Sequence, residues 1–401
     1  MPEPRAREPW RVLWVVAVVA CEGPAAPEVQ PVQTLVPEQI IRIGSVDDPV
    51  TALTSFDLLE VAGDGRIITL HDDVQEGRIH ARDGSLIAVF GGSGDGPGEF
   101  AGGARRMGLV GDEIWVYDWD SYRFSYFDLA GDFIRDERFE RGAWDPTDLT
   151  GPPSPDGKLG DGSIRGHPMV AASSVASGEV TSVAEMRLGL DGAVLDTILV
   201  RPLGGDQLAY EWGRGGMYGR QPYADSRILE ISRWRLEVVD VDRTLREGDR
   251  TFRVTKTTID GDTLWSRAYP FEPVPLPPSA VDSFVDEFVR QVADRIPPSA
   301  AELEEAIREA LFVPEALPAV ARVVVGRDGS TWLERGDRVS GTTAWLVLDP
   351  DGEVAGEVAL PELFRPCNAS LGDVWGELRD ELDVSYIVGY AVRPTVAEEV
   401  R

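Results

Sequence analysis

Residues 328–332 have the sequence DGSTW, in which an Asp-Gly turn pair is followed within three positions by an apolar residue that can begin a strand. Related segments recur along the chain: DGRII (64–68), GDEIW (111–115), DGSIR (161–165), DSRIL (225–229) and LGDVW (371–375). Their last residues follow one another at intervals of 47, 50, 64, 103 and 43 residues. Most of these intervals suit a repeated four-stranded unit, and the interval of 103 indicates an insertion.

Each unit continues with a second strand and a second turn, as in WLVLDPDGEVAGEVAL (345–360). Alternating apolar residues and frequent Gly and Pro favour short strands joined by tight turns. We therefore predict an all-β fold, a six-bladed β-propeller over residues 36–393. The sixth unit lacks an outer strand, and Glu38–Gly44 (EQIIRIG) is a strand without a unit of its own. We expect this segment to complete the last blade, because an open ring leaves an unpaired strand edge.

The long interval contains residues 279–313, which have the apolar periodicity of helices rather than strands. The apolar residues of its first half share one helical face, and Pro297-Pro298 separates the two halves. We predict a helical hairpin that is inserted between blades and packs over one face of the ring.

The N-terminus predicts an export signal. Val12–Ala20 is a nine-residue apolar run after three arginines, too short to cross a bilayer but long enough for a signal peptide. The end of the run, VVAC, resembles the lipobox of bacterial lipoproteins, which implies a lipid on Cys21. We expect residues 1–21 to be the signal, 22–35 a Pro-rich tether, and the protein to be held outside the cytoplasm at the cell envelope. Ordinary secretion and an uncleaved anchor are the alternatives.

The formal net charge of −30 (69 acidic against 39 basic residues) indicates that the protein does not bind nucleic acid or anionic headgroups. The chain has only two cysteines, which excludes a disulfide-built fold. We expect Cys367 to be a buried thiol and the protein to be a monomer whose membrane contact is the lipid on Cys21.

A family resemblance supports the fold. The segment GGSGDGPGEF (91–100) resembles the inter-blade turn of NHL-like six-bladed propellers, although no proline follows Phe100. Residues 323–337 and 375–392 are similar to the last blades of bacterial six-bladed propeller lipoproteins, a group related to NHL-like and TolB-like propellers. The resemblance spans about residues 36–393 and implies a fold and a location rather than an activity.

No motif predicts catalysis. The glycines of 91–100 lack the Lys-Ser/Thr of a phosphate loop, so we interpret them as a structural turn with Phe100 wedged between blades. Propellers related by fold include calcium-dependent lactonases and esterases whose metal ligands are often Asn, but Asn368 is the only asparagine here. We name no catalytic or metal-binding residue and expect no cofactor. The groups that we considered are His71-Asp72-Asp73 for calcium, His71, His80 and His167 for zinc, and the acidic hairpin Asp380, Glu381 and Asp383.

The tryptophans fall into two groups. Trp115, Trp332 and Trp375 recur at one position of the repeat and are expected in the core. Four others lie off that register and are candidates for a ligand surface: Trp119, Trp144, Trp212 and Trp234. The sequence thus favours a binding or scaffold module for a protein, peptide or glycan, with a lactonase- or esterase-type hydrolase in the central channel as the alternative.

Overall fold

The structure is a computed structural model. It describes residues 32–45, 58–142, 150–171, 174–175, 177–203, 207–212, 215–244, 250–293, 300–339, 341–382 and 384–395. Its strands and helices belong to one unit, residues 33–401. The predicted signal 1–21 with Cys21, the tether as far as residue 31, Trp144 and Asp383 lie outside the described residues. No helix in the described part of the chain is both long and apolar enough to cross a membrane.

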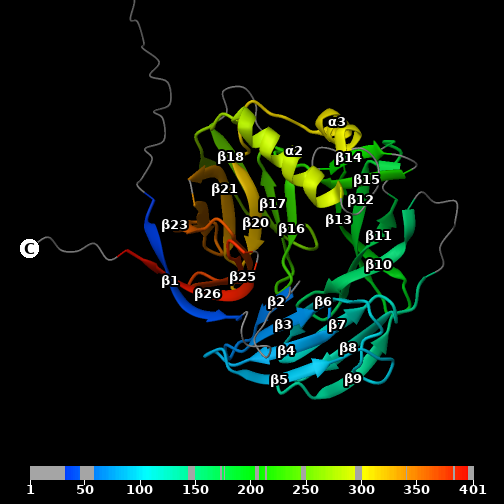
Figure 1. Ribbon diagram of the computed structural model, residues 1–401. Helices are drawn as coiled ribbons and strands as arrows, with labels where there is room; N and C mark the ends of the chain where they lie inside the picture. Colours follow the sequence, from blue (N-terminus) through cyan, green and yellow to red (C-terminus); the bar gives the residue numbers. More distant parts are fainter. Residues whose placement is uncertain are drawn as a thin grey trace, which may run out of the picture. The chain divides into compact units, whose positions relative to one another are not determined.

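Four sheets of four antiparallel strands follow one another along the chain (Figure 1). The first two sheets are β2 (Leu58–Val61), β3 (Ile67–His71), β4 (Glu76–His80) and β5 (Leu86–Gly91), then β6 (Ala104–Val110), β7 (Glu113–Asp118), β8 (Arg123–Phe127) and β9 (Phe133–Arg138). The others are β10 (Thr150–Lys158), β11 (Ile164–Val170), β12 (Ser182–Leu188) and β13 (Val194–Pro202), then β16 (Ile228–Ile231), β17 (Glu237–Asp242), β18 (Thr251–Thr258) and β19 (Thr263–Pro270). In each sheet the strands pair in chain order, which is the pattern of a propeller blade.

The remaining large sheet has eight strands in the order β20-β21-β22-β23-β1-β26-β25-β24. Its strands are β1 (Thr34–Ile43), β20 (Val320–Val325), β21 (Thr331–Val339), β22 (Thr342–Leu348), β23 (Val354–Pro361), β24 (Phe364–Ala369), β25 (Asp373–Arg379) and β26 (Ser385–Pro394). The described chain is therefore an all-β, propeller-like fold with added helices.

The predicted pairing of the N-terminal strand with the end of the chain is confirmed. β1 pairs antiparallel with β26 from Leu35 opposite Pro394 to Ile43 opposite Ile387. The strand begins earlier than the predicted Glu38, and its first residues also pair in parallel with β23, which joins two groups of four strands. Gly356 of β23 permits this approach, since a Cβ there would lie 2.6 Å from the carbonyl oxygen of Gln33.

The core lies between neighbouring sheets. Trp115, Trp332 and Trp375 are all buried, which confirms the prediction for this repeat position. Phe100 is fully buried among residues of the first two sheets, and its ring meets that of Phe127 edge-on at 6.1 Å. The Gly-rich segment before it is the structural turn that the sequence predicts, because a side chain at Gly91 would overlap the Phe100 ring.

The predicted register of the fourth repeat is wrong. The sequence places DSRIL (225–229) at the same repeat position as the other five segments, which lie between the first and second strands of their units, but the end of DSRIL forms β16, the first strand of its sheet. The turn that corresponds to the Asp-Gly turns of the other sheets is Ser232–Leu236, before β17. This turn has the sequence SRWRL and carries no Asp-Gly pair, so the Asp-Gly repeat pattern does not identify it as a turn.

The insertion contains two helices, as predicted: α2 (Pro278–Ala293) and α3 (Ala300–Ala310). They pack with a hairpin that the sequence did not predict, β14 (Gln207–Trp212) and β15 (Gly215–Arg220), around Leu208, Val285, Leu303 and Ile307. Figure 1 shows α2 and α3 beside this hairpin. Gln221, which follows the hairpin, donates a 2.8 Å hydrogen bond to the carbonyl of Ala310 and accepts one of 3.0 Å from the amide of Phe312.

Candidate ligand-binding site

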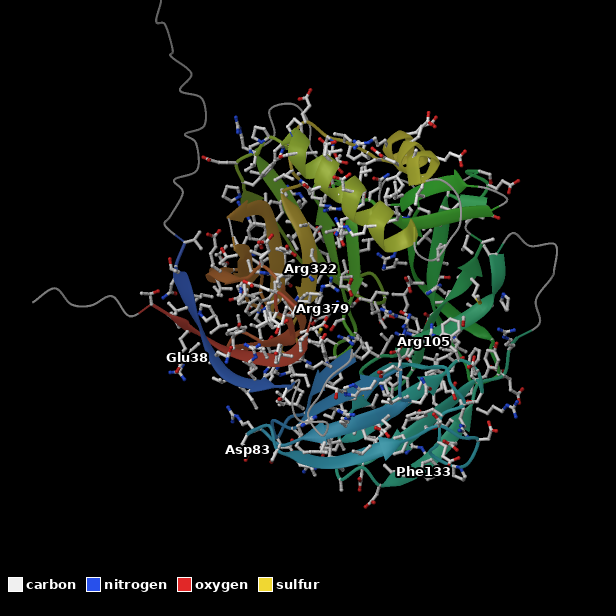
Figure 2. All side chains as sticks on the ribbon, viewed as in Figure 1. Glu38, Asp83, Arg105, Phe133, Arg322 and Arg379 are labelled. Carbon is white, nitrogen blue, oxygen red and sulfur yellow. The ribbon has the colours of Figure 1, made fainter. Side chains whose placement is uncertain are left out.

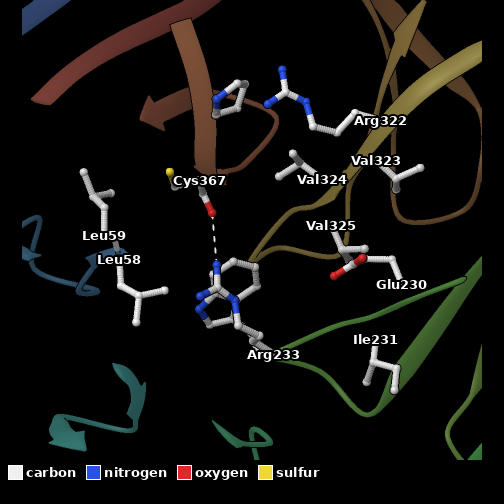
Figure 3. A pocket seen from close by; sticks show the side chains of 12 residues that line it. Leu58, Leu59, Glu230, Ile231, Arg233, Arg322, Val323, Val324, Val325 and Cys367 are labelled. Carbon is white, nitrogen blue, oxygen red and sulfur yellow. Dashed lines mark hydrogen bonds between the residues drawn. The ribbon is translucent and has the colours of Figure 1, made fainter. Parts of the chain in front are cut away.

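The first strands of the sheets face a common hollow. One part, of about 230 Å³, is lined by residues of β2, β16, β20 and β24, including Leu58, Glu230, Arg322 and Cys367 (Figure 3). A second part, of about 320 Å³, is lined by β2, β6, β7, β10, β11 and β16. The two parts adjoin, because Leu58, Glu230 and Arg233 line both.

The second part holds an arginine pair on one carboxylate. Arg106 Nε lies 2.7 Å from Asp156 Oδ1, and Arg165 binds the other carboxylate oxygen. Burial alone would raise the pKa of Asp156, but the two guanidinium groups outweigh it and hold the pKa below its usual value. Asp156 is therefore ionised at neutral pH, and the group of three carries a net positive charge.

The turn Ser232–Leu236 reaches across the hollow. Arg233 forms a 3.1 Å ion pair with Glu60 of β2 and donates a 3.1 Å hydrogen bond to the carbonyl of Cys367 in β24. The same turn packs on the β10–β11 turn, where a Cβ at Gly160 would lie 2.3 Å from the carbonyl oxygen of Trp234. The turn thus contacts three other sheets and covers this end of the hollow.

Glu60 stands at the middle of a buried polar network. Asn368 Nδ2 donates to Glu60 Oε2 at 3.1 Å, and Arg327 donates to Asn368 Oδ1 at 2.7 Å. Arg327 in turn contacts Asp373 at 2.7 Å. Burial raises the pKa of Glu60 despite the opposing effects of Arg233, the Asn368 amide and Arg327.

A third hollow, of about 480 Å³, adjoins the first through Arg322, which lines both. We call it the arginine mouth and define it by Arg243, Arg322, Arg365 and Arg379. Its other charged residues are Glu334 and Glu362. Arg322 and Arg379 are neighbours in Figure 2 near the middle of the view.

The charge of these hollows is opposite to that of the chain. Seven arginines and four carboxylates line the three hollows, while the whole chain has a net charge of −30. Lys158 also lines the second hollow, but its ammonium group is directed to Glu137, 3.2 Å away. The local charge of the hollows therefore differs in sign from the net charge on which the expectation about nucleic acid and anionic headgroups rests. The arginines are Arg106, Arg165, Arg233, Arg243, Arg322, Arg365 and Arg379, and the carboxylates are Asp156, Glu230, Glu334 and Glu362.

The three histidines have separate local partners. His71 Nε2 lies 3.0 Å from the Thr69 hydroxyl, His80 Nδ1 lies 3.3 Å from the Gly84 carbonyl, and His167 Nδ1 lies 3.1 Å from the Pro168 carbonyl. Within the residues that the structure describes, no group of three or more His, Cys, Asp or Glu could hold a metal ion. His71 is buried at the end of β3, and the neighbouring Asp73 caps its own turn by accepting from the amide of Val74.

The acidic hairpin in the last repeat is a turn. Asp380 accepts hydrogen bonds from the amides of Val384 and Leu382 and from the Tyr386 hydroxyl, and these bonds lower the pKa of its carboxyl. Cys367 is half-buried rather than fully buried; it lines the first hollow, and burial raises the pKa of its thiol.

Among the off-register tryptophans, Trp234 lines the first hollow. Trp119 instead packs edge-on against Tyr117, with ring centres 6.1 Å apart. Trp212 lies in β14, and its side chain is not described.

Sequence reasoning missed the arginines. Each stands alone on a different strand or turn and resembles an ordinary surface charge. A usable signal was present at SRWRLEVVDV (232–241), where two arginines flank a tryptophan at a turn that lacks Asp-Gly.

Comparison of the sequence with models of protein families found no match, and comparison with curated proteins found none either. Solved structures show a distant likeness. A member of the DUF4221 family from Bacteroides vulgatus is 11% identical, with 90% of this chain and 99% of that chain covered and a TM-score of 0.49. A catalytically inactive virginiamycin B lyase from Staphylococcus aureus is 9% identical (90% and 100% covered, TM-score 0.39), and a calcium-binding regucalcin from Agrobacterium tumefaciens is 9% identical (90% and 97% covered, TM-score 0.34). At such low similarity the functions of these proteins do not transfer to this chain.

Proposed function

We propose that this chain is a six-bladed β-propeller, held outside the cytoplasm by a lipid on Cys21, that acts as a binding module with its ligand site in the central hollow. The observation that supports it best is the convergence of β2, β6, β10, β16, β20 and β24 on adjoining hollows that are lined by polar side chains from separate sheets. Concave sites of this kind are where proteins usually bind small ligands.

A count of six blades requires that the eight-stranded sheet be two blades joined edge to edge. Splitting it between β23 and β1 gives two groups of four strands, because only Thr34 and Leu35 pair across that line. With the four separate sheets this makes six blades. Neighbour contacts support a ring, since β16, β20, β24, β2, β6 and β10 touch in that order, and the β10–β11 turn packs on the turn after β16.

The anchor can be tested with the two cysteines of the chain, because each serves as a control for the other. In a bacterial host that carries lipoprotein-processing enzymes, a palmitate analogue should label the wild type and Cys367→Ser but not Cys21→Ser. Cys21→Ser should also leave the membrane fraction. Membrane association and labelling of Cys21→Ser would disprove the lipid anchor.

The binding site can be tested by filling the hollow. Leu58 lines both inner hollows, so Leu58→Trp should obstruct them, whereas Leu195→Trp adds the same side chain at an exposed position of β13. In a thermal-shift screen with short peptides, oligosaccharides and small organic ions, compounds that stabilise the wild type and Leu195→Trp should fail to stabilise Leu58→Trp. Equal stabilisation of all three proteins would place binding elsewhere.

The alternative, a lactonase or esterase with its site in the same channel, stays a prediction. Hydrolysis of lactone or aryl ester substrates by the wild type, lost in Leu58→Trp and on calcium chelation, would establish it in place of a binding module.

A further inference from the structure

We infer that the arginine mouth binds a small multivalent oxyanion, a molecule that carries several carboxylate or phosphate groups. This inference rests on the central site proposed above and adds the chemical class of its ligand and the end from which the ligand enters. It stands on the four arginines of the mouth, on donors that remain unused there, and on the route that joins the mouth to the inner hollow.

Unused donors are the first observation. Arg365 of β24 is exposed and has no hydrogen-bond or ion-pair partner for its guanidinium group in the described part of the chain. Arg322 of β20 uses Nε in a 2.8 Å bond to Glu334 and lies over the ring of Trp345, and its terminal nitrogens donate no hydrogen bond to the described residues. A guanidinium offers five N–H donors in a planar fork that matches carboxylate and phosphate oxygens.

The remaining two arginines are held in place by the fold. Arg243 is almost fully buried and donates to the backbone carbonyls of Ser226 and Val320. Arg379 pairs with Glu377, with 3.0 Å between Nε and Oε1, at the end of β25. Because these contacts fix the side chains, the mouth would keep its arrangement before a ligand arrives, which reduces the entropy lost on binding.

The charge of the mouth favours an anion over other ligands. Four arginines and two glutamates line it, in a chain whose acidic residues outnumber the basic ones by 69 to 39. A local patch of opposite sign on an acidic protein concentrates anions at that patch. The inner hollows are also lined by arginines. Arg322 lines both the mouth and the first hollow, Arg233 lines the first and second hollows, and Arg106 and Arg165 line the second.

Entry is expected from the mouth. The opposite end of the hollow is covered by the turn Ser232–Leu236, whose Arg233 is bound to Glu60 and to the Cys367 carbonyl. At the mouth, Gln221 and Pro222 form part of the wall, and Gln221 is bound to Ala310 at the end of α3 and to Phe312 just after that helix. The helical insertion therefore supports one side of the entrance.

The experiment is isothermal titration of the Cys21→Ser protein with citrate and, separately, with inorganic pyrophosphate at low ionic strength. Spermidine serves as the cationic control. We expect saturable binding of at least one anion, no binding of spermidine, and an affinity that falls as salt is added. Tighter binding of citrate would identify a carboxylate ligand, and tighter binding of pyrophosphate a phosphate ligand.

The variant Arg365→Glu tests the site, because the Arg365 side chain has no partner to lose among the residues that the structure describes. We expect Arg365→Glu to weaken anion binding by about tenfold or more and Arg379→Gln by about fivefold, since each removes a charge-assisted contact. Arg253→Glu, a matched reversal at an exposed residue of β18, should change affinity less than about twofold. Thermal unfolding of each variant checks that it is folded.

Three results would overturn the inference: no anion binding by the wild type at millimolar concentration and low salt, equal affinity in Arg365→Glu and the wild type, or equal losses in Arg365→Glu and Arg253→Glu. Suppose that no anion binds, but a neutral compound binds the wild type and Arg365→Glu equally and does not bind Leu58→Trp. In that case the central binding site stands, and only the inference that its ligand is an anion fails.

Discussion

Asn368 Nδ2 donates a 3.1 Å hydrogen bond to Oε2 of Glu60, across 308 positions of sequence. The bond joins β24, in the last group of strands, to β2, in the first sheet after the N-terminal strand. Both side chains are buried, and the only asparagine of the chain is placed where it can donate to Glu60 and accept from Arg327 at the same time. A side-chain amide carries both an N–H donor for a carboxylate and a carbonyl acceptor for a guanidinium, so one neutral residue can bridge the two charged groups.

Asn368→Ala should therefore destabilise the protein by about 3 kcal/mol, because it leaves a buried acceptor on Glu60 and a donor on Arg327 without their partner. Urea unfolding followed by tryptophan fluorescence measures the loss. A change below about 0.5 kcal/mol would show that the network adds nothing to the joint between the two strands.

Glu60→Gln should change how stability depends on pH. The pKa of Glu60 is raised in the folded state, so the folded protein binds more protons than the unfolded chain between the ordinary value of 4.5 and the folded value. Wild-type stability contributed by this group falls as the pH rises through that window, and a glutamine has no such dependence. Relative to the wild type, the variant should be more stable at pH 7 than at pH 4; the reverse order in urea unfolding would contradict the raised pKa.

The fold was accessible from the sequence because its signals are local. Asp-Gly turns and alternating strands repeat within each unit, and the unpaired strand near residue 40 pointed to the pairing of β1 with β26. Two features escaped for physical reasons. The turn Ser232–Leu236 is stabilised by contacts with other sheets rather than by turn residues, and the β14–β15 hairpin depends on packing against α2 and α3.

The site could not be predicted in the same way. Arg106, Arg165, Arg233 and Arg322 come from different strands and turns, and only the arrangement of the sheets brings them to two adjoining hollows. The net negative charge of the chain gave no indication of a basic site, because a charge summed over all residues does not show a local excess of arginines. Trp234, which lines the first hollow, stood out in the sequence because a large aromatic residue outside the repeat register is a local anomaly.

Asp156→Asn should cost about 3 kcal/mol at pH 7, because it leaves the two guanidinium groups of Arg106 and Arg165 without their shared carboxylate. The pKa of Asp156 is lowered in the folded state, so its contribution is present above the ordinary value of 3.8 and is lost as the pH falls through the folded value. The penalty should shrink at pH 3 in urea unfolding. Asp260→Asn, at an exposed carboxylate 3.6 Å from Arg187, should change stability by less than about 0.5 kcal/mol. Similar losses in the two variants would contradict this account.

Phe100→Ala should cost about 3–5 kcal/mol, because Phe100 is fully buried where the first two sheets meet and its removal leaves a cavity. Phe133→Ala is the matched control, since the Phe133 ring is 39% exposed and belongs to the outer strand β9 (Figure 2). The difference in thermal or urea unfolding between the two variants should exceed about 2 kcal/mol. Equal losses would mean that Phe100 does not anchor the Gly-rich turn.

The labelling rate of the Cys367 thiol measures how well the turn Ser232–Leu236 covers the end of the first hollow. In Cys21→Ser protein it is the only thiol, it lines the first hollow beside the turn Ser232–Leu236, and burial raises the pKa of its thiol. Because the thiolate is the reactive form, maleimide labelling of the folded protein should be slow at pH 7 and should rise with pH to a midpoint above that of the same protein in urea. Trp234→Ala removes part of the wall and should speed labelling about fivefold or more. Trp265→Ala is the control, because Trp265 is bound to the Pro350 carbonyl at 2.8 Å, outside the hollows described above. If both variants label at the wild-type rate, the turn does not control access to the hollow from that end, and entry would have to be assigned on other grounds.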